Sequence, residues 1–219
     1  MQKVIKNNDN IYLLQDNCIE KYVISGSELN HISSIKSQIH TITNIDMDEQ
    51  NEIVLTLFSL SEYEDSVKLN IVKNENVTYI FGLGKLVKIH DIYILNNKNI
   101  VIIFDSHVDV YYQKKGLGTI MIFEEPIKYH NIIEFSNGDV CISINNFLKF
   151  YNFSYFQNSW PNEKQKVINC LKLTEFSDIV SLIPIEKNQV IYTTTNCYVK
   201  IIDFSKKKQI ITQTYVPEV

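Results

Sequence analysis

Residues 190–210 read VIYTTTNCYVKIIDFSKKKQI, and this stretch decides the fold. An apolar segment is followed by a polar turn, a second apolar segment and a turn with three lysines, without the apolar spacing of a helix. Short apolar segments separated by turn residues predict consecutive antiparallel strands. The stretch is therefore read as a β-hairpin followed by a basic turn.

The second half of this hairpin recurs along the chain as a polar turn followed by aliphatic, charged and aliphatic residues. The aliphatic residues that begin the copies are Ile19, Val67, Val108, Leu148 and Val199. Successive copies are 48, 41, 40 and 51 residues apart, near the ~40–45-residue period of four-stranded propeller blades. Five copies share 219 residues, about 44 residues each. The period and the length together predict five similar small sheets.

We therefore expect one all-β domain over residues 1–219, a five-bladed β-propeller of four-stranded antiparallel blades. The expected blades are 1–38, 39–84, 85–125, 126–175 and 176–219. The second strands, at 11–14, 53–58, 100–104, 140–144 and 190–192, are nearly all apolar, which predicts burial on both faces. Residues 1–6 are expected to form the first inner strand. If they complete the last blade instead, the ring is left incompletely closed until a partner completes it, and the isolated chain aggregates.

Composition supports an all-β fold and argues against nucleic acid as the main ligand. The chain has no Ala, the best helix former, but has 13 Tyr and 11 Phe together with many Ile, which prefer strands. It also has no Arg and a net charge of −4, whereas nucleic-acid-binding domains carry a basic face. The surplus of Ile, Asn, Lys and Tyr indicates an A+T-rich genome.

No metal site, cofactor or export signal is expected. The four cysteines form no CxxC pair and have no His at zinc-finger spacing, so we expect neither a structural metal nor a disulfide framework. The first residues lack the apolar core of a signal peptide, and the longest apolar runs are far shorter than a membrane span. These features predict an intracellular protein, cytoplasmic or nuclear.

Two segments resemble the WD40 repeat family. Residues 130–140 (HNIIEFSNGDV) are similar to the family's His and inner strand, and residues 193–204 to the stretch that ends in its Trp-Asp pair. No copy keeps Trp-Asp, so the resemblance is to a degenerate repeat. It implies that a His before each inner strand joins a buried polar network, with Asn in place of the family's Asp. The implied structural residues are His40, His90, His130, Asn145, Asn196 and Asp203.

No catalytic residue is predicted. The Gly-Leu-Gly pairs at 82–84 and 116–118 lack the spacing of phosphate-binding loops. A hydrolase that uses the central channel would need converging carboxylates, and the acids near the inner strands occupy unmatched positions. These acids are Asp46, Asp91, Glu134 and Asp178. We therefore expect no enzyme and no small-molecule substrate, with a channel hydrolase as the alternative.

Two loops are candidate partner-binding sites. The first lengthens the fourth blade and has Tyr155, Phe156 and the only Trp, Trp160, and such aromatic residues dominate interface hot spots. The second is an acidic hairpin tip that could meet a basic partner. Its residues are Glu62, Tyr63, Glu64 and Asp65. The lysines at 206–208 leave a minor contact with RNA open.

The expected function is that of a non-catalytic scaffold or adaptor that mediates protein–protein interactions within a larger macromolecular complex. The propeller faces and inserted loops would contact other proteins, because rigid blades present loops on both faces. The alternatives are the channel hydrolase and an RNA-associated complex subunit.

Overall fold

The computed structural model describes residues 3–15, 18–36, 41–48, 53–59, 67–73, 76–82, 89–96, 99–112, 115–151, 171–186, 189–204 and 214–215. These residues form five four-stranded antiparallel sheets and no α-helix. No described segment is a helix long and apolar enough to cross a membrane. The all-β architecture with four-stranded antiparallel sheets is confirmed. The chain divides into two compact units, Met1–Glu124 and Glu125–Val219, which are described separately.

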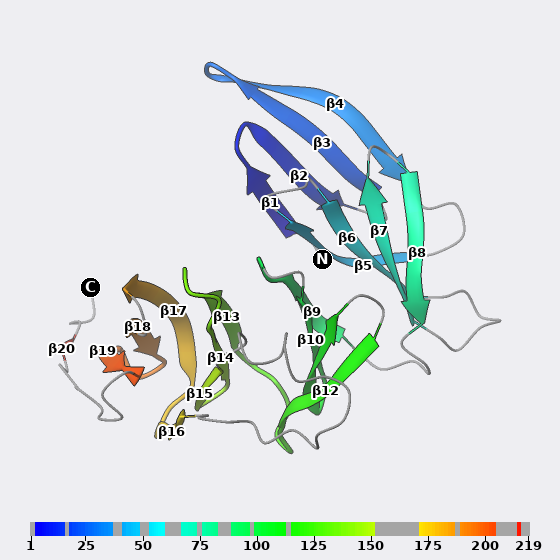
Figure 1. Ribbon diagram of the computed structural model, residues 1–219. Helices are drawn as coiled ribbons and strands as arrows, with labels where there is room; N and C mark the ends of the chain where they lie inside the picture. The colour runs from blue at the N-terminus through cyan, green and yellow to red at the C-terminus, as the bar shows by residue number, and fades with distance from the viewer. Residues whose placement is uncertain are drawn as a thin grey trace. The chain divides into compact units, whose positions relative to one another are not determined.

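The first unit contains three sheets (Figure 1). The first sheet consists of β1 (Lys3–Asn7), β2 (Asn10–Gln15), β3 (Cys18–Ser25) and β4 (Glu28–Lys36). The second consists of β5 (Thr41–Asp48), β6 (Ile53–Ser59), β7 (Val67–Lys73) and β8 (Asn76–Gly82). The third consists of β9 (Ile89–Ile94), β10 (Asn99–Phe104), β11 (His107–Tyr112) and β12 (Lys115–Ile122).

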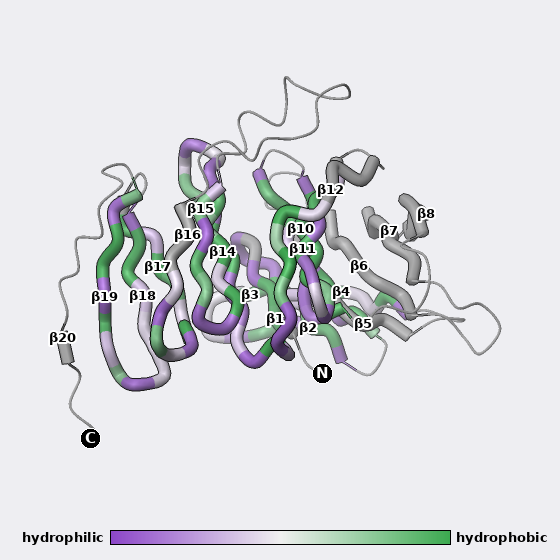
Figure 2. The backbone as a smooth tube through the Cα atoms, turned by 90° about the horizontal axis from the view of Figure 1, so that it is seen from below, coloured by the Kyte–Doolittle hydropathy of each residue, from purple (hydrophilic) through white to green (hydrophobic). Residues whose placement is uncertain are grey.

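The second unit contains the fourth and fifth sheets. The fourth consists of β13 (His130–Glu134), β14 (Val140–Ile144), β15 (Phe147–Tyr151) and β16 (Leu171–Thr174). The fifth consists of β17 (Ile179–Glu186), β18 (Gln189–Thr194), β19 (Tyr198–Asp203) and β20 (Thr214–Tyr215). Figure 2 shows hydrophobic residues concentrated within these strands and hydrophilic ones at several of the turns.

Each described sheet is built from four consecutive strands. The strand at Lys3–Asn7 pairs with β2 and is the inner strand of the first sheet, as the sequence predicts. At the other end, Thr214–Tyr215 pairs with β19 in the fifth sheet. Within the described residues, no strand is therefore exchanged between the first and the last sheet.

Turn contacts repeat in the third and fourth sheets at the spacing that the sequence predicts. Leu95 N–H donates to Asn99 O at 2.8 Å, and Phe135 N–H, forty residues later, donates to Asp139 O at the same distance. Leu95 and Phe135 are both buried. The same backbone bond therefore closes the turn between the first two strands of both sheets.

Adjacent inner strands lie side by side within each unit. In the first unit β5 contacts both β1 and β9, and Ile45 of β5 packs against Tyr12, Leu14 and Ile19 of the first sheet. In the second unit β13 contacts β17. There a single apolar core joins the facing sides of the two sheets, including Phe150, Leu182 and Tyr192.

The second strands differ in burial, and here one sequence expectation is wrong. Every residue of β10 and of β14 is buried, as predicted for strands covered on both faces. In β2 and β18, by contrast, buried and half-buried side chains alternate. The buried residues of β2 and β18 pack against the neighbouring sheet of the same unit, and the apolar residues on their other faces are only half buried.

Gly138 offers a test of the turn that joins β13 to β14. Its φ is +81° and no heavy atom lies within 4 Å of a Cβ built there, so backbone strain is the main penalty for a side chain. We expect Gly138→Ala to lower the free energy of unfolding by about 1 kcal/mol, measured by urea denaturation. Gly138→Asn should cost less, because Asn tolerates positive φ better. Equal stability of Gly138→Ala and the parent would contradict this reading.

Candidate functional site

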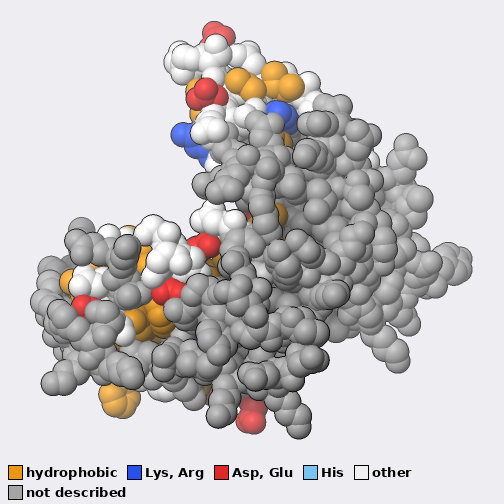
Figure 3. All heavy atoms as spheres, in the orientation of Figure 1, with side chains coloured by type: hydrophobic (Ala, Val, Ile, Leu, Met, Phe, Trp, Pro, Cys, Tyr) orange, Lys and Arg blue, Asp and Glu red, His pale blue; other side chains and the backbone are white. Residues whose placement is uncertain are grey.

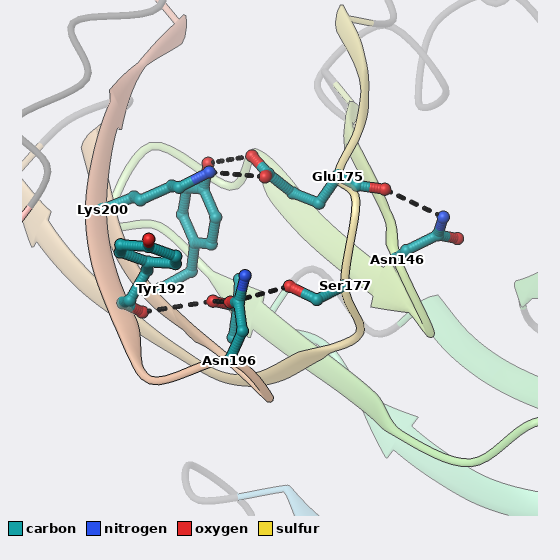
Figure 4. A network of polar contacts seen from close by, with 8 residues as sticks. Asn146, Glu175, Ser177, Tyr192, Asn196 and Lys200 are labelled. Atoms are coloured by element: carbon teal, nitrogen blue, oxygen red, sulfur yellow. Dashed lines mark hydrogen bonds and ion pairs between the residues drawn. The ribbon is translucent and has the colours of Figure 1, made fainter. Parts of the chain in front are cut away.

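The link between β16 and β17 contains a buried ion pair. The Glu175 carboxylate is largely buried; it accepts a hydrogen bond from Tyr192 Oη at 2.5 Å and one from Lys200 Nζ at 2.6 Å (Figure 4). The Lys200 side chain is 14% exposed. Such a pair gains little net stability, because desolvation offsets attraction, but it strongly disfavours other geometries of the same groups. The pair therefore fixes Glu175 against the fifth sheet.

The backbone of the same link is attached to the fourth sheet. Glu175 N–H donates to Asn146 O at 2.8 Å, and Asn146 Nδ2 donates to Glu175 O at 3.0 Å. At the other end of the link, Ile179 N–H donates to Asn145 O at 2.7 Å. Ser177 Oγ adds a bond to Asn196 Oδ1 at 2.8 Å. The link is thus fastened on both sides of residue 176.

Phe176 is fully exposed in the middle of this fastened link, with a relative exposure of 105%. In the space-filling view, hydrophobic side chains reach the surface beside acidic ones (Figure 3). An isolated exposed hydrophobic residue is ordinary, but the residues on either side of Phe176 are hydrogen-bonded. That arrangement suits contact with another macromolecule.

Asn145 holds the turn between β14 and β15 and the segment before β13 together. It has a φ of +49° and is buried. Its Oδ1 accepts bonds from Lys128 N–H at 2.8 Å and Tyr129 N–H at 3.3 Å, while its Nδ2 donates to Pro126 O at 2.9 Å. A carboxylate could not make the last bond, because it has no proton to donate. This explains why an amide fits where the WD40 resemblance implies Asp.

The other residues expected in polar networks are found in different surroundings. Asn196 is exposed and accepts bonds from Ser177 and Thr194. Asp203 is buried and accepts a bond from Gln189 Nε2 at 3.0 Å. His130 begins β13 and is half buried. Their structural roles stay predictions.

His90 forms a pair that the sequence reading missed. Its Nε2 lies 2.6 Å from Oδ1 of Asp105, in the turn between β10 and β11. Asp105 precedes Asn145 by forty residues, so the repeat spacing could have found it. In the third sheet the turn residue Asp105 contacts the His90 ring near the start of the inner strand β9. In the fourth, Asn145 accepts bonds from backbone N–H groups just before the inner strand β13.

Several predicted site residues lie outside the described residues. They are His40, the acidic tip Glu62, Tyr63, Glu64 and Asp65, the aromatic loop residues Tyr155, Phe156 and Trp160, and the lysines at 206–208. Their roles in partner binding, structure and RNA contact stay predictions.

A second polar cluster on the first sheet brings nucleophile-bearing side chains together. Glu20 accepts bonds from Cys18 Sγ at 2.9 Å and from Ser34 Oγ, and His31 Nε2 lies 2.7 Å from its carboxylate. These contacts, that of Cys18 first, lower the pKa of Glu20 to about 2. Burial and then the bond to Glu20 raise the pKa of Cys18 to about 11.

This cluster is not arranged for nucleophilic catalysis. His31 uses the same nitrogen, Nε2, towards both Glu20 and Ser34, so Glu20 cannot orient the ring from its opposite nitrogen as a triad requires. The Cys18 thiol is protonated at neutral pH, and the thiolate is the nucleophile. The described residues also contain no group of three side chains that could hold a metal ion.

Two of the inner-strand acids lie near one tyrosine in the first unit. The pKa of Tyr93 is raised well above its usual range by burial, then by its contacts with Asp91 and the charge of Asp46. Asp46 Oδ2 accepts a bond from Ile94 N–H at 2.6 Å, and Asp91 Oδ1 one from Ile92 N–H at 2.9 Å. Both carboxylates therefore accept hydrogen bonds from the backbone of β9, which is a structural role.

No family model and no curated protein sequence matches this chain. Among solved structures, the chain is similar to the WD40 β-propeller domain of Doa1 with a TM-score of 0.62 and 10% sequence identity. The fold is that of a WD40-like β-propeller. The match covers 94% of this chain and 66% of the Doa1 chain. The sheets described above thus correspond to propeller blades, while five as the complete number of blades and the closure of the ring stay predictions.

The Glu175–Lys200 pair gives a test of how the blade link is fixed. Lys200→Met leaves a buried carboxylate without its cation, so we expect a loss of about 3–5 kcal/mol in unfolding free energy, measured by urea denaturation. The double variant Lys200→Met/Glu175→Gln removes both charges and should recover much of this loss. Equal instability of the single and double variants would show that the loss is not due to the unpaired charge.

Thiol reactivity tests the cluster around Glu20. In a chain with Cys170→Ser, we expect iodoacetamide to modify exposed Cys197 rapidly at pH 8 and Cys18 slowly, because a thiol with a pKa near 11 is protonated there. Peptide mass spectrometry after timed quenching distinguishes the two sites. Glu20→Gln should speed modification of Cys18, since the carboxylate helps to raise its pKa. Fast modification of Cys18 in the parent chain would refute the described geometry.

Proposed function

We propose that this propeller is a non-catalytic scaffold that binds a partner protein through Phe176 within a larger intracellular assembly. The supporting observation is that the Phe176 ring is fully exposed while its two neighbours are held by side-chain contacts. Glu175 is bonded to Asn146 and Lys200, and Ser177 is bonded to Asn196. WD40-like propellers typically serve protein interactions, and the proposal follows that general use of the fold.

A fixed exposed aromatic ring is an efficient anchor. Transfer of a Phe side chain from water into a pocket contributes roughly 1.5–3 kcal/mol. Much of the cost of binding comes from ordering side chains and loops at the interface. That cost is reduced here because the Glu175 backbone on one side of Phe176 is already bonded to Asn146, and the Ser177 hydroxyl on the other side is bonded to Asn196.

The surroundings of Phe176 suggest the character of the partner surface. Tyr129, which precedes β13 and whose carbonyl accepts the Asn145 N–H group, is a second exposed aromatic residue of this unit. Lys128 Nζ and Asp178 Oδ2 lie 3.9 Å apart and provide one charge of each sign. The proposed partner therefore offers an apolar pocket with a polar, electrically balanced rim, as protein interfaces commonly do.

The alternatives have weaker support. A channel hydrolase needs carboxylates free to act on a substrate, whereas Asp46 and Asp91 accept backbone hydrogen bonds. A role as an RNA-associated subunit would depend on the lysines at 206–208, which lie outside the described residues. The absence of Arg from the chain also weighs against this role. Contact with RNA therefore remains a minor part of the proposal.

Affinity purification from the native source with quantitative mass spectrometry tests the function. We expect a partner that co-purifies with the parent chain to be depleted about 30-fold with Phe176→Ser, the effect of losing a hot-spot residue. Ile122→Ser is the matched control, because Ile122 is also a strongly exposed hydrophobic residue (77%) but belongs to the other unit. Both variants should melt at the parent temperature.

Two outcomes would overturn the proposal. Retention of every co-purifying protein by Phe176→Ser would show that this residue is no anchor. Equal depletion by both variants would indicate nonspecific capture through exposed hydrophobic groups.

A further inference from the structure

The turn between β13 and β14 contains Asn137 followed directly by Gly138, the only Asn-Gly pair in the chain. Asn is a chemically labile residue, because the backbone nitrogen of the next residue can attack its side-chain amide carbon. Both groups belong to one chain, so the attack is unimolecular. A following Gly has no Cβ and obstructs the attack least. By sequence, Asn137 is therefore the amide of this chain most prone to the reaction.

The folded turn holds both reacting groups in hydrogen bonds that oppose the attack. Gly138 N–H donates to Phe135 O at 2.9 Å, so the proton that the nitrogen must lose is bound to a carbonyl. The Asn137 side chain is bonded twice to Asp139. Its Oδ1 accepts from Asp139 N–H at 3.1 Å, and its Nδ2 donates to Asp139 Oδ2 at 2.8 Å. An Asn bonded in this way to the backbone two residues on stabilises a turn, so the reaction requires the turn to open.

The tip of this turn can open while the strands on each side stay packed. Ser136 and Asn137 are exposed, whereas Phe135 and Asp139 are buried. Phe135 also belongs to the apolar core of the second unit. Local opening costs less than global unfolding where few apolar contacts are broken. Opening of the tip is therefore the step that we expect to expose Asn137 to attack.

The corresponding turn of the third sheet lacks the Gly. The two turns have the same closing backbone bond at a spacing of forty residues. Forty residues before Asn137 and Gly138, the sequence has Asn97 and Lys98. The Lys98 side chain obstructs the backbone nitrogen, so Asn97 is an internal reference with the same electrophile and a hindered nucleophile.

We propose that Asn137 is a site of spontaneous deamidation, with a rate set by opening of the turn between β13 and β14. The Gly138 nitrogen forms a bond to Cγ of Asn137, and Nδ2 leaves as ammonia with the proton that Gly138 loses. A five-membered succinimide ring results. Water then breaks one of the two bonds from ring carbonyl to nitrogen. Cleavage at the side-chain carbonyl gives Asp, and cleavage at the backbone carbonyl gives isoaspartate.

Either product fits the closed turn less well than Asn137 does. Aspartate has no N–H group to donate, so its carboxylate faces that of Asp139, which is 5% exposed. Burial already raises the pKa of Asp139, and the bond from Asn137 counteracts this rise. A carboxylate in place of that amide raises the pKa further. Isoaspartate instead lengthens the backbone between Phe135 and Gly138 by one carbon. The modification therefore favours the open turn and cannot be reversed by refolding.

Peptide mass spectrometry of the purified full chain, aged in mildly alkaline buffer, tests the site. We expect deamidation at Asn137 to be at least about 10-fold slower in the folded chain than in urea, because the closed turn must open first. Asn97 in the same samples should react far more slowly than Asn137 in urea. An unmodified Asn137 in urea, equal rates in both states, or equal reaction of the two Asn residues overturns the proposal.

Two substitutions separate the chemistry from the opening. Gly138→Ala should slow deamidation roughly 10-fold in urea, where folding plays no part, because a Cβ obstructs the nitrogen. Asp139→Ala removes the carboxylate that binds Nδ2 and should speed deamidation several-fold in buffer but not in urea. A folded Asp139→Ala chain that reacts at the parent rate refutes control by the turn. If this variant does not fold, the parent's rates in buffer and in urea still decide that question.

The effect of the product is tested with Asn137→Asp, which mimics the Asp form. Two neighbouring carboxylates have higher pKa values in the folded turn than in the unfolded chain, so folding stability is lost as pH rises from about 4 to 7. We expect the urea midpoint of this variant to fall relative to the parent over that range. Asn137→Asp/Asp139→Asn restores one amide beside one carboxylate and should remove the fall. A midpoint difference that is constant with pH contradicts the proposed effect of the modification.

Discussion

A four-stranded sheet with apolar residues on both faces must be covered on both faces, and this constraint organises the protein. β10 and β14 meet it completely, with every residue buried. β2 and β18 meet it only on the face that packs against the neighbouring sheet of the same unit. Burial of apolar surface is the main favourable term in folding. The half-covered sheets are therefore where association with something further gains most.

Polar groups at the ends of the fourth and fifth blades are hydrogen-bonded to one another. Asn145 uses both ends of its amide to hold three backbone groups before β13, and its own carbonyl receives the first N–H of β17. The Glu175 carboxylate is paired with Lys200 and Tyr192. Since buried polar groups are costly when unpaired, these bonds restrict the link between two blades to one path. Phe176 is displayed at the surface as a result.

Phe176 is a single ring on a hydrogen-bonded link, suited to a pocket in another protein. The cluster of Cys18, Glu20, His31 and Ser34 contains reactive residue types, but its hydrogen bonds stabilise the carboxylate and the protonated thiol. Its geometry is consistent with a structural role.

The sequence by itself determined the repeating strands and the four-stranded antiparallel sheets, because strand spacing and turn residues are local properties of the chain. It also predicted an inner strand at the start of the chain, where β1 (Lys3–Asn7) is found. It could have identified Asp105 through the forty-residue spacing to Asn145. The prediction that residues 11–14 and 190–192 are buried on both faces was wrong. An apolar sequence shows that a strand can be buried, but it does not show whether another part of the protein covers each face.

Only the tertiary structure decided which apolar residues are covered and which buried charges meet. Glu175 and Lys200 are 25 residues apart, and nothing in their local sequence pairs them. Phe176 follows a buried residue in an ordinary-looking link, yet it is exposed because Asn146 and Asn196 hold the chain around it. Exposure and pairing depend on contacts between distant segments, so local patterns specify the strands while packing selects the surfaces that remain available to partners.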